Sequence, residues 1–403
     1  MTLSKRARAY AGAPGPAYEL HAMVAADPWS PANPDGYVSL VAAENHLVYD
    51  VLESALTGPR RITAEDTHYQ EAAGMPSFRA ELARFLGRQR GTEVDPEHLV
   101  VFGGSICALE ALAFTLCDPG VGIVVPAPYW AGVDEAVGRS GAVVVPAVRS
   151  SADGFALTAE VVERAIVQAR GRGQSLRAVA LLSPDNPVGN VYDAATLTAV
   201  AEVVHGQGLQ LISDEVYAGS VYDGEFVSAA AVDAVPPERL HLVWGFAKDF
   251  GLSGFKTGVL HSTDPQVLAA ARRLAFFSQV SSDTQVLLRD MLADDELMSR
   301  LRSESAARLG EAYARTTKAL AEHGIEFTPS GAGLYAWVDL RPYLDEPTFE
   351  GEARLWRRLA ESARVLISPG ESFHAPEPGW FRLCFAGSPE ALEVALDRLA
   401  RHL

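Results

Sequence analysis

A lysine and an aspartate, each placed just after an apolar strand-like run, are the residues of this chain best suited to chemistry. Asp214 lies in Ser-Asp-Glu-Val-Tyr at 213–217, and Lys248 follows in a loop bracketed by glycines. A carboxylate at the carboxyl end of a strand points into the crevice where open α/β sheets bind ligands. A lysine there can form an imine with an aldehyde and, once released, can move a proton. Either residue alone is more often a solvated or capping side chain, but the pair suits an aldehyde-bearing pyridine cofactor, whose ring nitrogen needs an anion.

Two further side chains could reach the oxygen of such a ring. Asn186 lies in Ser-Pro-Asp-Asn-Pro-Val-Gly at 183–189, after another strand-like run, and Tyr217 closes the motif of Asp214. Both can donate a hydrogen bond to a phenolic oxygen, which lowers the proton affinity of an adjacent imine. Taken alone, the run at 183–189 is an ordinary turn. Because X-Pro bonds adopt the cis form far more readily than other bonds, we expect a cis bond at Asn186–Pro187.

Three more motifs could hold the rest of a cofactor and a substrate. The run Gly-Gly-Ser-Ile-Cys at 103–107 follows a strand and opens a helix, where backbone N–H groups bind phosphate, although the motif alone is weak. Trp130 follows the next strand and could stack on a ring or be an ordinary core or interface aromatic. Arg382 is the one charged residue in the apolar run 380–385, where it could clamp a substrate carboxylate or form a structural salt bridge.

The elements that must position these residues alternate between short apolar runs and longer amphipathic stretches, which is typical of a mostly parallel sheet between helices. Expected strands are 99–102, 122–125, 142–146, 178–182, 209–213 and 240–244. Expected helices are 77–86, 108–116, 194–205, 266–277 and 299–323, the last long enough to bridge two domains.

A smaller α+β domain is expected at the C-terminal end of the chain. It would contain strands at 334–340 and 380–385 and a helix at 352–362. We therefore expect a large domain at 50–295, and a second unit formed by 1–49 together with 296–403. Residues 11–36 are rich in Pro, Gly and Ala without periodicity, and we expect them to form an extended arm that packs on a second subunit.

Composition excludes several classes of function. The chain has 403 residues, of which 48% are apolar, and its net charge of −17 disfavours nucleic acid or an anionic membrane as a partner. No apolar run approaches the roughly 20 residues that span a bilayer, and no apolar core follows the basic residues near the start. The three cysteines have no metal-ligand spacing, so we expect no metal site and a reducing, cytoplasmic location.

Together these motifs resemble the fold type I pyridoxal 5'-phosphate (PLP) enzymes, specifically the class I/II aminotransferases, and within them the 1-aminocyclopropane-1-carboxylate (ACC) synthases. The likeness covers nearly the whole chain. Besides the motifs above, it rests on Asp-Pro-Trp-Ser-Pro at 27–31, Ala-Ala-Glu-Asn at 42–45, Tyr-Gln at 69–70, Gly-Met-Pro-Ser-Phe at 74–78, Ser-Pro-Gly-Glu-Ser-Phe-His at 368–374 and Glu-Pro-Gly-Trp-Phe-Arg at 377–382. The resemblance implies an aspartate aminotransferase-like fold and a homodimer with shared active sites.

The resemblance also implies a role for each matching residue. Lys248 would be the imine lysine and α-proton base, and Asp214 and Tyr217 would complete the catalytic group. The cofactor would be held by Ser105, Ile106, Cys107, Trp130, Asn186, Asp214, Tyr217, Lys248 and Lys256. The substrate would be held by Ala43, Glu44 and Arg382, with Glu44 matching a residue that contacts S-adenosylmethionine in ACC synthases.

The sequence departs from the family pattern around the cofactor phosphate. Lys256 replaces an arginine, which keeps the charge but loses the bidentate fork. Gly245 replaces a serine, and Ala72 aligns with the tyrosine that crosses the dimer in ACC synthases. Trp130 is the aminotransferase-like choice at a position where ACC synthases have tyrosine. Looser anchoring of the phosphate could leave room for a second small-molecule substrate.

The resemblance therefore implies external aldimine formation and α-deprotonation, followed by γ-elimination or γ-replacement on S-adenosylmethionine. An aminotransferase that passes an amino group to a 2-oxo acid is the alternative, which Trp130 favours and Glu44 disfavours. A protein that has lost catalysis and serves as a binding partner is a third reading. The presence of Lys248, Asp214 and Arg382 argues against the third.

Overall fold

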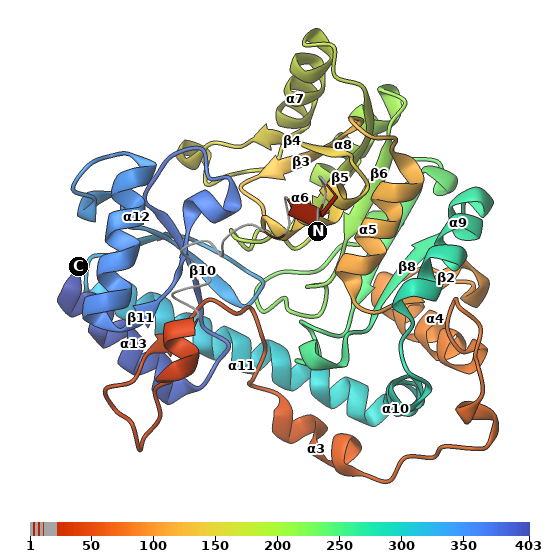
Figure 1. The fold of residues 1–403 in the computed structure, drawn as a ribbon, viewed down its shortest axis with the longest axis horizontal. Helices are drawn as coiled ribbons and strands as arrows, with labels where there is room; N and C mark the ends of the chain where they lie inside the picture. The colour runs from red at the N-terminus through yellow and green to blue at the C-terminus, as the bar shows by residue number, and fades with distance from the viewer. Residues whose placement is uncertain (1–2, 5–6, 9–10, 12–21) are drawn as a thin grey trace.

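A seven-stranded, mostly parallel sheet forms the centre of the molecule (Figure 1), as seen in a computed structural model that describes residues 3–4, 7–8, 11 and 22–403. The strand order is β2-β8-β7-β6-β5-β3-β4, and only β8 runs antiparallel to its neighbours. The strands are β2 (Leu99–Phe102), β3 (Gly122–Ala127), β4 (Val143–Val148), β5 (Leu176–Leu182), β6 (Gln210–Asp214), β7 (Leu240–Gly245) and β8 (Gly258–Ser262). The central strands are apolar on both faces because helices cover both.

Helices cover the two faces of this sheet in separate apolar clusters. One cluster joins the sheet to α5 (Ser105–Leu116), α6 (Gly132–Arg139) and α9 (Pro265–Ala275). Another joins it to α7 (Ala159–Gly171) and α8 (Ala194–Gly206). A third packs α3 (Tyr49–Thr57), α4 (Pro76–Arg90) and α10 (Ser282–Ala293) around buried aromatics of β7 and the loop after it.

A second, four-stranded antiparallel sheet lies at the C-terminal end of the chain, in the order β12-β13-β10-β9. Its strands are β9 (Glu326–Thr328), β10 (Tyr335–Asp339), β12 (Ser368–Pro369) and β13 (Trp380–Cys384). It packs with α11 (Asp295–Glu322), α12 (Phe349–Arg358) and α13 (Pro389–His402). Figure 1 shows α11 extending from α10 to the helices of this second unit.

The N-terminal segment joins the second unit through a parallel pair of short strands, β1 (Val38–Ser39) and β11 (Val365–Leu366). The expected extended arm was wrong for residues 22–26, which are helical. Met23 and Val24 pack with Val41, Trp356 and Leu366, so apolar contact stabilises a turn of helix there. Residues 12–21 of the expected arm lie outside the described residues, and the expected domain boundaries stay a prediction.

Every strand expected in the large unit is present, with ends shifted by at most a few residues, whereas β8 was missed. The run Gly-Val-Leu-His-Ser of β8 is short and contains few apolar residues, so it does not stand out from the loop that precedes it. No helix among the described residues is long and apolar enough to cross a membrane. Those residues also contain no group of three or more His, Cys, Asp or Glu side chains that could hold a metal ion.

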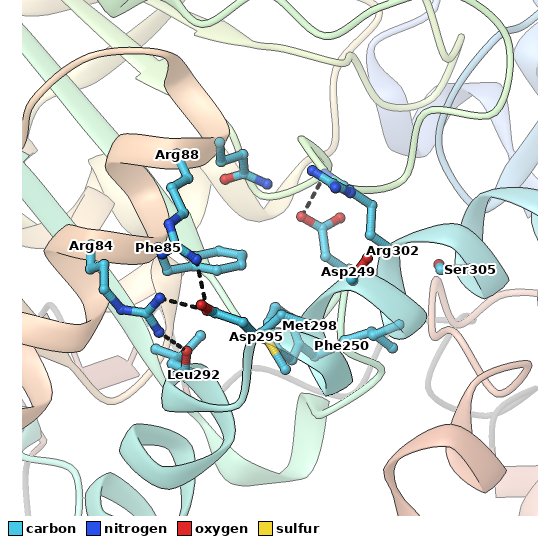
Figure 2. A pocket seen from close by; sticks show the side chains of 14 residues that line it. Arg84, Phe85, Arg88, Asp249, Phe250, Leu292, Asp295, Met298, Arg302 and Ser305 are labelled. Atoms are coloured by element: carbon cyan, nitrogen blue, oxygen red, sulfur yellow. Dashed lines mark hydrogen bonds and ion pairs between the residues drawn. The ribbon is translucent and has the colours of Figure 1, made fainter.

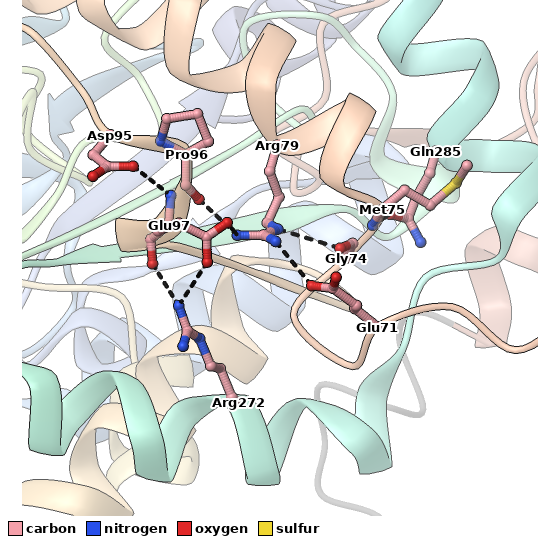
Figure 3. A network of polar contacts seen from close by, with 9 residues as sticks. All are labelled: Glu71, Gly74, Met75, Arg79, Asp95, Pro96, Glu97, Arg272 and Gln285. Carbon is pink, nitrogen blue, oxygen red and sulfur yellow. Dashed lines mark hydrogen bonds and ion pairs between the residues drawn. The ribbon is translucent and has the colours of Figure 1, made fainter.

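A buried arginine fixes the segment that leads into α4 (Figure 3). The Arg79 guanidinium is 2% exposed and contacts the carboxylates of Glu71 at 2.9 Å and Glu97 at 3.0 Å. It also donates to the carbonyl oxygens of Gly74 (3.3 Å) and Pro96 (2.9 Å). The network thereby holds the 71–76 loop against the turn that precedes β2.

Arg79→Ala should lower the free energy of unfolding by about 2–4 kcal/mol, because it removes buried packing and leaves two carbonyls without their donor. Arg272, at the exposed end of the same network, donates to the Glu97 carbonyl at 2.7 Å. Arg272→Ala is the matched control and should cost less than about 1 kcal/mol. Chemical denaturation of both variants measures the difference; equal losses would show that burial of Arg79 is not what matters.

Candidate functional site

The predicted functional side chains meet at one edge of the seven-stranded sheet, where three neighbouring parallel strands end. Asn186 follows β5, Asp214 is the last residue of β6, and Lys248 follows β7. Leu182 of β5 pairs with Asp214, and Asp214 pairs with Val243 of β7, so the three loops leave the sheet side by side. This is the edge at which open α/β sheets bind ligands.

The Lys248 ammonium is largely shielded from solvent and lies beside the N-terminal segment. Its Nζ donates to the Ala43 carbonyl oxygen at 2.7 Å and lies 6.0 Å from the centre of the Tyr217 ring. Burial lowers the pKa of Lys248, and the nearby Arg382 guanidinium lowers it further. A lysine with a depressed pKa is more readily available as a nucleophile or proton acceptor at neutral pH.

The Asp214 carboxylate is shielded from solvent and poorly compensated. Its Oδ1 accepts a hydrogen bond from the Val216 N–H at 3.2 Å. Burial raises the pKa of Asp214 to about 7, and the neighbouring Glu215 carboxylate adds to that rise. Bringing a protonated ring nitrogen against Asp214 would supply the missing positive charge and restore the ionised form.

Arg382 and Asn186 form one buried polar pair. The Arg382 Nη1 donates to Asn186 Oδ1 at 3.0 Å, and Nη2 donates to the Val41 carbonyl at 2.5 Å. The Nε atom of Arg382 is buried without a hydrogen-bond partner among the described residues. The guanidinium also lies 5.3 Å from the Tyr335 ring centre and 4.8 Å from that of Phe373. Arg382 thus retains a donor for an incoming anion. The Asn186–Pro187 bond is cis, as expected.

The start of α5 lies against two glycines of the strands that flank the lysine loop. A Cβ at Gly245 would come within 3.5 Å of the Ser105 Cβ, and one at Gly258 within 2.2 Å of the Ser105 nitrogen. The first N–H groups of a helix have no partner within it and suit a phosphate. Lys256 is exposed with a left-handed backbone (φ 47°). Burial raises the pKa of Cys107, and the charge of Lys256 partly opposes that rise, so Lys256 lies near the same helix start.

A cavity of about 700 Å³ opens beside these residues. Its walls include the predicted residues Ile106, Cys107, Trp130 and Arg382. Trp130 is 44% exposed, so part of its side chain is open to a bound group.

Glu44 is half-buried close to the lysine. Its carboxylate contacts His46 at 3.3 Å. A hydrogen bond with the Ser253 side chain lowers the pKa of Glu44, with a further contribution from His46. Glu44 therefore carries a negative charge beside Ala43, whose carbonyl accepts from Lys248.

Three buried acidic residues that support the site were missed by the sequence reading. Each directly adjoins a predicted residue: Asp185 precedes Asn186, Glu215 follows Asp214, and Asp249 follows Lys248. Asp185 contacts Arg149 at 2.5 Å, and Glu215 contacts Arg90 at 3.0 Å.

Asp249 ties the lysine loop to the turn after Tyr217. Its carboxylate accepts from the Gly219 N–H and the Ser220 hydroxyl, both at 2.7 Å. The sequence did offer one signal for these acids, because each is the direct neighbour of a motif residue. Consecutive side chains of an extended segment point to opposite faces, so such a residue would be expected inside the protein and not in the site.

Comparison with known proteins gives two concordant findings. Residues 40–399 match the family model for aminotransferase class I and II. A 1-aminocyclopropane-1-carboxylate synthase from Glycine max is 36% identical over 91% of this chain and 80% of its own length. A synthase from Oryza sativa subsp. japonica is 38% identical, with the same coverage, and one from Arabidopsis thaliana is 37% identical over 92% of this chain and 83% of its own.

Solved structures agree on the fold. The aspartate aminotransferase from Thermus thermophilus with maleate superposes with a TM-score of 0.83 at 27% identity, covering 100% of both chains. An aspartate aminotransferase from Thermotoga maritima has a TM-score of 0.80 at 24% identity and covers 99% of both chains. The α/β architecture is therefore that of the fold type I enzymes.

Proposed function

The chain belongs to the class I and II aminotransferase family and is a PLP-dependent enzyme, and we propose that it removes the α-proton of an α-amino acid and then breaks a bond at the γ-carbon, with S-adenosylmethionine as the substrate. The observation that carries this proposal is the position of Glu44. Its ionised carboxylate lies beside Ala43, which contacts Lys248, so a negative charge borders the reacting lysine. A sulfonium substrate would complement that charge.

The residues of the site fit PLP. Asp214 offers a shielded carboxylate that no cation among the described residues contacts, and at the start of α5 the N–H groups of Ser105 and Ile106 donate to no described backbone group. PLP supplies an aldehyde that lysine can capture and a ring that absorbs electrons released at the substrate's α-carbon. We propose that Asn186 and Tyr217 donate to the ring oxygen, that Trp130 covers the ring, and that Ser105, Ile106, Cys107 and Lys256 hold the phosphate.

The remaining residues are proposed to act on the substrate. Arg382 binds the α-carboxylate through its donors, including the Nε that has no partner among the described residues. Lys248 takes the α-proton on Nζ, for which its depressed pKa suits it. Breaking the bond between Cγ and sulfur then sends the electron pair to sulfur, so methylthioadenosine leaves as a neutral thioether. The curated relatives named as ACC synthases favour this reaction.

Transamination is the second candidate, and two observations favour it. Trp130 is free to cover a ring face in the aminotransferase manner, and the similar solved structures are aspartate aminotransferases. This reaction would require the same site to accept a 2-oxo acid after the amino acid has left. The cavity of about 700 Å³ would also admit a second small-molecule substrate in a γ-replacement.

Incubation of the purified enzyme with S-adenosylmethionine should release methylthioadenosine, detected by chromatography. The co-product then separates the reactions: ACC indicates ring closure, 2-oxobutyrate indicates elimination, and a larger amino acid indicates replacement by a second substrate. The alternative result is that no methylthioadenosine forms and pyridoxamine phosphate accumulates from a common amino acid. That result would overturn the leading proposal in favour of transamination.

We further propose a cytoplasmic homodimer with shared active sites. The three cysteines are free thiols, which fits a reducing compartment. Large aromatic side chains are exposed at the cavity, on α5, before α4 and after α9, which fits a surface covered by a second subunit. They include Tyr69, Phe114, Trp130, Phe276 and Phe277.

A further inference from the structure

A second pocket lies behind the lysine loop, residues 245–251, and is formed mainly by α4 and α11 (Figure 2). Its volume is about 260 Å³. Figure 2 shows Arg88 and Phe85 of α4 on one side, with Asp249 and Arg302 opposite them. None of its wall residues lines the cavity that contains Trp130 and Arg382, so it is a separate site.

The pocket combines an apolar floor with charged groups. The floor is made by Phe85, Phe250, Leu292, Met298 and Leu301. Such a lining, with a few convergent polar groups, is typical of small-molecule sites.

The charges around the pocket leave an excess of positive charge. Arg84 and Arg88 both contact the carboxylate of Asp295, at 2.6 and 2.7 Å, and Arg84 also contacts Glu81 at 2.8 Å, so these two arginines are balanced and the excess comes from Arg302. Arg302 is exposed and has no carboxylate within 4 Å among the described residues. Burial raises the pKa of Asp249 to about 7, so this carboxyl is only about half ionised at neutral pH and cancels only part of the excess. An anion is therefore the favoured occupant.

One neutral group of the wall also lacks a partner. The Oε1 atom of Gln89 is buried and accepts no hydrogen bond from the described residues. Leaving a buried acceptor unpaired costs free energy, which an N–H or O–H of a bound molecule would recover. The pocket is therefore complementary to a compact apolar molecule that carries a carboxylate and a hydrogen-bond donor.

The pocket touches three segments of the candidate active site from behind. Asp249 and Phe250 directly follow Lys248 and form part of the wall. Gly219, whose N–H donates to Asp249, lies two residues after Tyr217. Ser305 accepts a hydrogen bond from Asn45, the neighbour of Glu44, at 3.2 Å.

We propose that this pocket binds a small apolar carboxylic acid bearing a hydrogen-bond donor, and that its occupancy is coupled to the lysine loop. The carboxylate pairs with Arg302, the donor satisfies Gln89, and the apolar body packs on Phe85 and Met298. Contact with Phe250 and Asp249 then transmits the presence of the acid to Lys248. Such coupling is reciprocal, so the state of the coenzyme also changes the affinity for the acid.

The test uses 4-hydroxyphenylacetate, which carries the required groups and has no amino group to react with the coenzyme. Calorimetric titration of the holoenzyme should give a Kd on the order of 1 mM. The neutral analogue 4-hydroxyphenylacetamide should bind at least about 10-fold more weakly, as should the acid to Arg302→Gln and Gln89→Leu. Met298→Trp, which fills the pocket, should abolish binding while the protein stays folded by circular dichroism.

Two controls separate this pocket from other sites. Arg315→Gln removes an exposed arginine of the same helix outside the pocket and should leave Kd unchanged. Arg382→Gln removes the proposed carboxylate clamp of the active site and should also leave Kd unchanged. Coupling is read from the pH midpoint of the coenzyme absorbance, which should move by about 0.3 unit or more when the acid is bound.

Failure of this proposal is distinct from failure of the proposed function, because binding is measured without turnover. Absence of binding, equal binding to Met298→Trp, or loss of binding in Arg382→Gln alone would each overturn the site. Binding that leaves the absorbance midpoint in place would overturn the coupling to the lysine loop.

Discussion

Lys248→Ala should abolish the covalent link to the coenzyme and reduce turnover by at least about 10⁴-fold. The variant loses the amine that captures the aldehyde, and the same amine is the proposed proton acceptor. The visible absorbance of the linked coenzyme should disappear, although PLP can still bind through the remaining contacts. Borohydride reduction of the native holoenzyme, followed by peptide mapping, should place the label on the peptide that contains Lys248.

The composition of the chain makes this experiment unusually discriminating. The sequence contains four lysines: Lys5, Lys248, Lys256 and Lys318. Lys318 is 77% exposed on α11 beside Glu322, so Lys318→Ala is a matched control that should keep full absorbance. Lys256→Ala should keep the link but weaken coenzyme binding. A Lys248→Ala variant that retains the absorbance would show that another lysine holds the coenzyme.

Arg382→Gln should reduce kcat/KM by roughly 10²–10³-fold, because on the proposed function it removes the buried charge that binds the substrate carboxylate. The loss should fall mainly on amino-acid binding, measured by the spectral change on titration. The coenzyme link in the free enzyme should remain, since Arg382 contacts Asn186 and Val41 and not the lysine.

The matched control is Arg341→Gln. Arg341 lies near the same strand, 4.9 Å from the Trp380 ring centre, but its ion pairs with Asp339 and Glu377 are partly exposed. Its loss should change kcat/KM by less than about threefold, as for other exposed pairs. An equal effect in both variants would indicate that Arg382 acts through the stability of β13 and not through the substrate.

The sequence could predict the fold because the short apolar runs that mark the strands are also buried on both faces of the sheet. In β2, Val100 and Phe102 enter one apolar cluster, while Leu99 and Val101 enter another. Asp214 could be placed as well, because a polar residue directly after such a run lies at the carboxyl end of a strand, where open α/β sheets bind ligands.

The supporting shell could not be predicted, because it depends on contacts between distant residues. Nothing local indicates that Glu215 meets Arg90, or that Ser305 meets Asn45. The helical turn at 22–26 was missed because its stability comes from Trp356 and Leu366, far along the chain. The pocket behind the lysine loop likewise combines α4 with α11, which share no sequence motif.

The pairing of β1 with β11 affects the order in which the parts of the site can fold during synthesis. Val38 pairs with Val365, and the segment that follows β1 supplies Ala43, which contacts Lys248. On a ribosome the large sheet can form while the chain is still being made, whereas this segment must wait for its partner strand. The candidate site is therefore completed only after residues 365–366 have been made, and until then residues 38–39 have no strand to pair with.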